Sequence, residues 1–319
     1  MASRIPVQNT PRRRVPSGRG DVVYAAYWFA AIALGAAALL GVPLGQAAAV
    51  AVGAVVFIGG GLPHGAYDIA LLRRVMLMDR NRLTLAVAGY VLTAVSMAML
   101  WRSAPLVALI LFLAVAAVHF GEDWPMLEEP LLRVAAGAAV IAAPTIGHPA
   151  EVSALFVAMS DTRATVIAQI ITAAAPVTLL VTAVGIVVAW RDGSRHWAAA
   201  MALCLALLLV LPPVWGFALF FVFLHSPRHL AQTRVALHGM TRRRWLGTGA
   251  ALSVVTVLGW CGLQWIAPPV IGPPMVAQAF QLLASVAVPH LLLSRWIERR
   301  LDQAGTSSHS VPQEETALQ

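Results

Sequence analysis

Long apolar segments, separated by short polar turns, recur along almost the whole chain and limit what it can fold into. The mean hydropathy is +0.77 and only 11% of the residues are charged, whereas a soluble domain carries roughly 25%. A soluble core of this size cannot bury so many apolar side chains, but a helix of about 20 apolar residues crosses a bilayer. The sequence therefore predicts an all-α fold, a polytopic bundle of membrane-spanning helices.

About ten apolar segments are long enough to form these transmembrane helices. They lie at 24–42, 47–72, 84–101, 105–121, 131–147, 164–190, 197–211, 213–228, 246–267 and 277–294. The pair Pro212 and Pro213 divides two of them, because proline interrupts a helix, and segment 150–160 is predicted to lie at the membrane interface. We expect a transmembrane domain over 23–300 between a disordered basic N-terminal tail, 1–22, and a polar C-terminal tail, 301–319.

The positions of the arginines predict how the helices are oriented. All 22 basic residues are arginines, and they gather in the N-terminal tail, in loops 73–83, 191–196 and 229–245, and after residue 294. Cytoplasmic loops carry such an excess, so both termini are expected in the cytoplasm. Loop 122–130 departs from the pattern because it is acidic. Arginines scattered in this way do not form a nucleic-acid surface, and the lack of lysine excludes a Schiff-base retinal protein and a P-loop enzyme.

Five of the nine histidines lie within or at the ends of the predicted spans. They are His64, His119, His225, His229 and His290. Ionisable groups inside a span are rare and are usually functional. In the predicted topology these five lie on four spans that run in the same direction, and all lie towards the cytoplasmic ends. This shared depth indicates one common site, while the other four histidines are interpreted as peripheral.

Three carboxylates follow these histidines at helical spacing: Asp68, Glu122 and Asp123. A metal-bound histidine usually donates its other ring N–H to a carboxylate or a carbonyl. The three acids are therefore candidate partners of metal-bound imidazoles. The alternatives are an exposed loop face for the second and third, and an interfacial ion pair for the first.

The type of ligand narrows the choice of metal. Imidazoles suit zinc, copper, iron and nickel, and the two cysteines, Cys204 and Cys261, do not have the spacing of a metal site. His225 and His229 lie four residues apart and thus on one helical face. The chain has one such pair, which favours a mononuclear site. Four imidazoles around octahedral iron would leave two positions for dioxygen and for a ligand on the substrate side.

Four motifs together resemble those of the Brp/Blh family, the membrane β-carotene 15,15′-dioxygenases of bacteria and archaea. They are GLPHGAYD (61–68), AVHFGED (117–123), HSPRH (225–229) and VPH (288–290). The resemblance implies cleavage of the central double bond of β-carotene with O2, at a non-haem Fe(2+), to give two retinal molecules. The iron ligands that it implies are His64, His119, His225 and His229. His290 would lie beside them or on the substrate side, and a separately encoded rhodopsin could use the retinal.

A carotenoid dissolves in the lipid bilayer, so its enzyme would reside in the plasma membrane as a multi-pass protein and open a tunnel between helices. The candidate tunnel residues are Tyr67, Phe120, Trp215, Phe220 and Phe221, although ordinary packing explains any one of them equally well. The alternative functions are a membrane metal-ion transporter and a non-catalytic carotenoid- or quinone-binding protein. Transport predicts polar groups stepped through the whole bilayer, but the outer halves of these segments are almost purely apolar.

Overall fold

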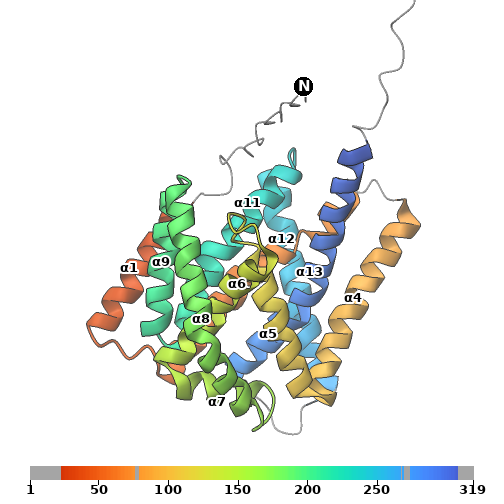
Figure 1. The fold of residues 1–319 in the computed structure, drawn as a ribbon. Helices are drawn as coiled ribbons and strands as arrows, with labels where there is room; N and C mark the ends of the chain where they lie inside the picture. Colours follow the sequence, from red (N-terminus) through yellow and green to blue (C-terminus); the bar gives the residue numbers. More distant parts are fainter. Residues whose placement is uncertain (1–22, 76–78, 267, 269–273, 308–319) are drawn as a thin grey trace, which may run out of the picture.

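The computed structural model describes residues 23–75, 79–266, 268 and 274–307, and every regular element in them is a helix, as the sequence predicts (Figure 1). The elements are α1 (Ala25–Leu39), α2 (Ala47–Gly65), α3 (Asp68–Val75), α4 (Arg80–Ser103), α5 (Pro105–Gly121), α6 (Pro130–Gly147), α7 (Pro149–Met159), α8 (Ala164–Arg191), α9 (Arg195–Val210), α10 (Pro213–Phe220), the π-helical turn η1 (Phe221–His225), α11 (Ser226–Ala236), α12 (Arg242–Ile266) and α13 (Met275–Ser307). The long helices run roughly along one direction and form a bundle.

Six of the described helical segments are long and apolar enough to cross a membrane. They are Ala47–Arg74, Arg80–Ser103, Pro130–Gly147, Ala164–Arg191, Arg242–Ile266 and Met275–Ile297. Shorter apolar helices occupy the predicted spans at 24–42, 105–121 and 197–211, and the predicted interfacial segment. The polytopic helical class is thus confirmed, while the count of about ten spans and the cytoplasmic termini stay predictions. The N-terminal tail and residues 308–319 lie outside the described residues, and α13 continues past residue 300.

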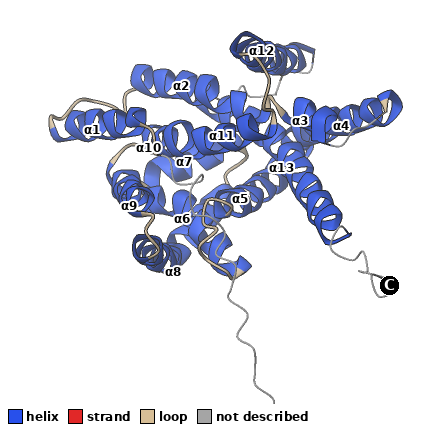
Figure 2. Cartoon of the chain, turned by 90° about the horizontal axis from the view of Figure 1, so that it is seen from above, coloured by secondary structure: helices blue, strands red, loops and turns tan. Residues whose placement is uncertain are grey.

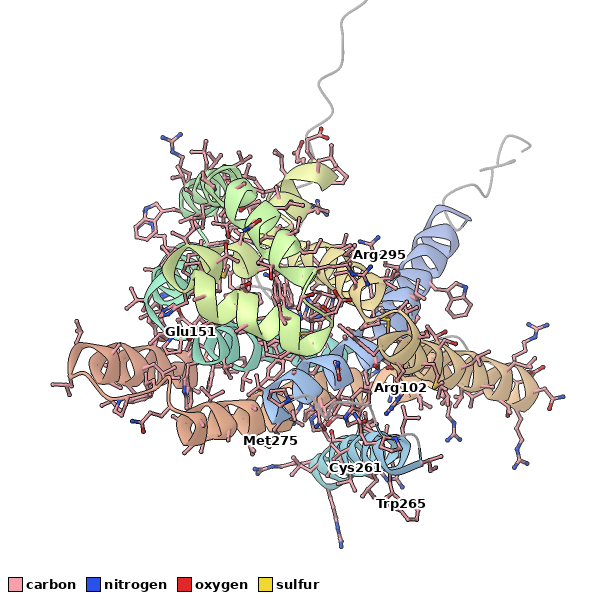
Figure 3. All side chains as sticks on the ribbon, turned by 90° about the horizontal axis from the view of Figure 1, so that it is seen from below. Arg102, Glu151, Cys261, Trp265, Met275 and Arg295 are labelled. Atoms are coloured by element: carbon pink, nitrogen blue, oxygen red, sulfur yellow. The ribbon has the colours of Figure 1, made fainter. Side chains whose placement is uncertain are left out.

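Helices α13 and α12 differ sharply in how much of their surface is buried. Helix α13 packs against α2, α4, α5 and α7, and 61% of its most apolar stretch is buried, compared with 6% for α12. Figure 2 shows α12 at the edge of the bundle, and Trp265 near its end is 86% exposed (Figure 3). Apolar side chains exposed in this way suit lipid rather than water. His290 on α13 is instead in the protein interior, where it is 7% exposed.

The chain between Pro213 and Ala236 is one helical rod with a single irregular turn. Helix α9 ends at Val210 and α10 begins at Pro213, which confirms the predicted break. Further on, Pro227 has no N–H with which to close an α-helical hydrogen bond. The turn before it is the π-helix η1, which ends at His225. A π-helical turn changes the direction of the side chains around it and occurs often at functional sites.

Two glycines of α2 allow this helix to approach η1 closely. A Cβ atom at Gly61 would collide with the ring of Phe221, and one at Gly60 would collide with Val222. Small residues at a membrane helix interface let the two backbones come together. The sequence GGG at 59–61 therefore brings the end of α2 against the turn that carries His225.

Candidate metal centre

Three histidines from three helical elements converge on one point. His119 lies at the end of α5, His225 ends η1 and His229 lies in α11. Each offers one ring nitrogen, and these nitrogens lie within 4.8 Å of one another. The Nε2 atoms of His119 and His225 are 3.1 Å apart, and the ring centroids of His225 and His229 are 4.4 Å apart. His225 and His229 therefore lie on the same face, as their spacing predicted, although Pro227 stands between them.

The acidic loop after α5 turns two carboxylates towards these histidines. Nδ1 of His119 donates to Oε2 of Glu122 at 2.9 Å, and Nδ1 of His225 donates to Oδ2 of Asp123 at 2.7 Å. Oδ1 of Asp123 also lies 3.7 Å from Nε2 of His229. Asp123 is fully buried, and burial raises the pKa of its carboxyl to about 6, while Arg228 and His119 act to lower it. Two of the four acids in this loop thus have histidine partners.

A fourth imidazole borders the cluster and has a carboxylate of its own. The ring centroid of His290 lies 5.3 Å from that of His119. Its Nδ1 donates to both carboxylate oxygens of Asp68, at 2.9 and 2.8 Å. The hydroxyl of Tyr90 on α4 donates to the same carboxylate at 3.0 Å. Asp68 is therefore a partner of His290, although its spacing in the sequence pointed to His64.

His64 itself belongs to α2, but its side chain lies outside the described part of the structure. The position of this turn of α2 is nevertheless defined by Gly65, the next residue. A Cβ atom built on Gly65 would be 3.6 Å from Nδ1 of His290. The backbone of α2 that carries His64 therefore runs directly past His290.

The donor set has the chemistry of a metal site. A neutral imidazole that donates through Nδ1 presents Nε2 as a lone-pair acceptor. His119 and His225 both donate through Nδ1 to carboxylates, yet their Nε2 atoms face each other at 3.1 Å. Two lone pairs at this distance repel each other unless a positive charge lies beside them. A cation held by these two and by His229 satisfies all three rings, and imidazole with a carboxylate behind it is the usual form of such a ligand.

Arg228 contacts the candidate centre, although the sequence analysis did not single it out. Its guanidinium donates to the backbone oxygen of Asp123 at 2.7 Å and lies 4.8 Å over the ring of Trp197. The neighbouring Trp124 is fully buried against Gly185 of α8. Together these contacts anchor the acidic loop. The available signal was an arginine between the two histidines of HSPRH, in an apolar region that follows an acidic loop.

An apolar cavity, here called the inner cavity, reaches His119. Of the predicted tunnel residues, Phe120 and Phe221 line it. Phe220 is fully buried and packs against Phe120, with ring centroids 5.0 Å apart. Trp215 packs near Gly53 of α2. Tyr67 stacks on Trp245 of α12 and donates to its backbone oxygen at 2.9 Å, so it lies apart from this cavity.

The fold and the site define a class: a helical membrane protein with a buried histidine and carboxylate centre next to an apolar cavity. The family model for beta-carotene 15,15'-dioxygenase matches residues 52–298. The chain belongs to this family, as its motifs indicated.

Two curated relatives match most of the chain. One is the beta-carotene 15,15'-dioxygenase of an uncultured marine bacterium, 66A03, with 27% identity over 263 residues, which covers 77% of this chain and 92% of the relative. The other is the probable beta-carotene 15,15'-dioxygenase Blh of Halobacterium salinarum, with 26% identity over 303 residues, covering 81% of this chain and 86% of the relative. No solved structure matches the chain.

Proposed function

We propose that the protein cleaves β-carotene at its central 15,15′ double bond with O2, giving two molecules of retinal, in the plasma membrane. The observation that carries the proposal is the set of ring nitrogens of His119, His225 and His229 within 4.8 Å of one another, next to an apolar cavity. Membership of the family supports the substrate and the bond that is cleaved. One oxygen atom of O2 enters each aldehyde, so no other oxidant is required.

The metal that we assign to this centre is Fe(2+), held by the three converging histidines. His64 completes the set that the family resemblance implies, and His290 lies beside it. When bound, ferrous iron would supply the one-electron chemistry that makes dioxygen reactive towards an alkene. The protein's part is to orient the imidazoles, since three separate carboxylates fix the planes of their rings: Glu122, Asp123 and Asp68.

The chain also supplies a dry surface for the polyene. Phe120 and Phe221 border the inner cavity next to His119, and apolar walls exclude the water that would compete for the metal. Most sides of the cavity offer only carbon, which matches a hydrocarbon and disfavours a hydrated ion. We therefore prefer the dioxygenase to a metal-ion transporter or a non-catalytic carotenoid-binding protein. Retinal made here would be available to a separately encoded rhodopsin.

Expression in a bacterium that makes β-carotene tests the proposal. We expect the orange colour to fade and retinal to accumulate with the wild-type protein. His225→Ala should abolish both effects, whereas His196→Ala, an exposed histidine at the start of α9, should retain them. If purified iron-loaded protein forms no aldehyde from β-carotene and O2, and proteoliposomes instead move divalent metal, then the transporter is the correct function.

A further inference from the structure

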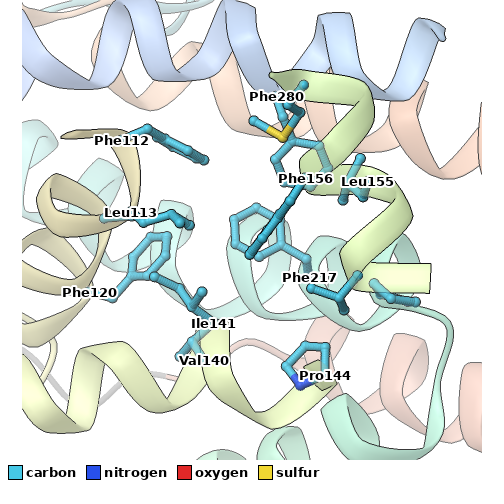
Figure 4. A pocket seen from close by; sticks show the side chains of 14 residues that line it. Phe112, Leu113, Phe120, Val140, Ile141, Pro144, Leu155, Phe156, Phe217 and Phe280 are labelled. Atoms are coloured by element: carbon cyan, nitrogen blue, oxygen red, sulfur yellow. The ribbon is translucent and has the colours of Figure 1, made fainter. Parts of the chain in front are cut away.

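A second apolar cavity adjoins the inner cavity on the side of α6 and α7. We call it the side cavity. The two cavities share four lining residues: Phe112, Ala116, Phe120 and Phe217. Because these residues border both spaces, the side cavity lies directly next to the cavity that reaches His119. Figure 4 shows the side chains that surround the side cavity.

The wall that belongs to the side cavity alone is supplied mainly by α6 and α7. Ile141 and Pro144 come from α6, and Val152, Leu155 and Phe156 come from α7 (Figure 4). None of the residues that line this cavity carries a charge or a hydrogen-bonding side chain. Its ligand is therefore a hydrocarbon group. An enclosure of branched and aromatic side chains suits a bulky end group better than a bare polyene chain.

We propose that the side cavity binds one ring-terminated half of the carotenoid and that Ile141 and Leu155 select the end group. This assignment rests on the proposed function, since it takes the bond to be cleaved to lie beside the histidines. The polyene then runs along Phe112, Phe120 and Phe217, which border both cavities. The terminal ring lies against α6 and α7. The site is distinct from the metal ligands, so the two can be tested separately.

The test uses the full-length, iron-loaded protein in detergent micelles and β-carotene as the probe. Leu155→Phe and Ile141→Phe fill the side cavity from two different helices. Leu132→Phe is the matched control, because Leu132 lies on α6, is 41% exposed and does not line the cavity. Leu155→Ala is a second variant that removes contacts without adding bulk. The iron content of every preparation reports whether the histidine cluster is intact.

Binding is measured first without O2, from the circular dichroism induced in the polyene absorption band, so that no cleavage occurs. We expect the two filling variants to bind β-carotene about tenfold or more weakly, as hydrophobic pockets discriminate by size. Leu155→Ala should weaken binding severalfold, and Leu132→Phe should match the wild type. Unchanged binding in all the cavity variants, or no binding by the wild type, would overturn the proposal.

Readmission of O2 then separates this proposal from the proposed function. If the wild type forms retinal and the cavity variants still bind β-carotene normally, the role of the side cavity is refuted and the proposed dioxygenase function is not. Binding that depends on Leu155 and Ile141 without any retinal refutes the dioxygenase and leaves the binding site standing.

Discussion

His290 on α13 and Asp68 at the start of α3 are joined through Nδ1 and both carboxylate oxygens, across 222 positions of sequence. Tyr90 of α4 donates to the same carboxylate. The contact thus ties three helical elements together at the edge of the histidine cluster. The same arrangement recurs at His119 with Glu122, where a carboxylate also receives the Nδ1 proton. Each carboxylate fixes one ring, and this repetition predicts how the centre responds to mutation.

The first prediction concerns the charge of Asp68. Asp68→Asn keeps an oxygen acceptor for His290 but removes the negative charge that strengthens the hydrogen bond. Loss of the outer partner of a metal ligand typically costs 10–100-fold in metal affinity, and because His290 lies beside the proposed ligands we expect a decrease in iron affinity of at most about tenfold. Chelator competition on purified protein measures it. Asp192→Asn, at an exposed position, is the control, and equal affinity in the two variants would show that Asp68 does not act on the metal.

The second prediction identifies the metal ligands. Alanine in place of His119, His225 or His229 removes one of the nitrogens that lie within 4.8 Å of one another. We expect each change to lower bound iron by more than the 10–100-fold typical of outer partners. Metal analysis of the purified variants gives the answer, with exposed His196→Ala as the reference. A histidine whose loss leaves the iron content at the wild-type level is not a ligand.

The sequence predicted a shared histidine site from the common depth of the histidines in the predicted topology, and local periodicity placed His225 and His229 on one helical face. It also predicted that the acidic loop serves the histidines, since Glu122 lies one helical turn after its partner. The contacts of His119 with Glu122 and of His225 with His229 are short in sequence and depend on helix geometry. The contacts of His225 with His119 and Asp123 span more than 100 residues and depend on how the helices pack.

The partner of Asp68 could not be predicted in this way. Helix α2 ends at Gly65 and α3 begins at Asp68, so the chain turns between them and the four-residue spacing from His64 no longer marks one face. The actual partner comes from α13, and only tertiary packing brings it there. Arg228 was missed for a related reason: its contacts lie in the loop after α5 and on Trp197 of α9.

The third prediction concerns Arg228, which holds the acidic loop by a hydrogen bond and by a cation–π contact with Trp197. Arg228→Met removes the charged donor to the backbone oxygen of Asp123, and hydrogen bonds to charged groups contribute about 1.5–3 kcal/mol. We expect a loss of stability of this order, together with weaker iron binding. Arg228→Lys should restore little, because an ammonium group lacks the planar fork of N–H donors that reaches the backbone oxygen of Asp123 while the group lies over Trp197. Thermal unfolding in detergent measures the stability, and full recovery by lysine would show that the shape of the guanidinium is not required.

The last prediction compares two glycines of the same helix. A Cβ atom at Gly61 would collide with the ring of Phe221, whereas nothing lies within 4 Å of one at Gly59. Gly61→Ala therefore forces α2 away from η1, and overpacking of this kind typically costs about 1–3 kcal/mol. Because Phe221 lines the inner cavity and η1 carries His225, we expect lower thermal stability, weaker β-carotene cleavage and reduced iron content. Gly59→Ala places the same methyl group in open space two residues earlier. Its free energy of unfolding should stay within about 1 kcal/mol of the wild-type value, because only the helix propensity changes. The test is to measure the unfolding temperature, the retinal yield and the iron content of the two variants side by side. Equal behaviour of the pair would mean that the close approach of α2 to η1 does not support the centre.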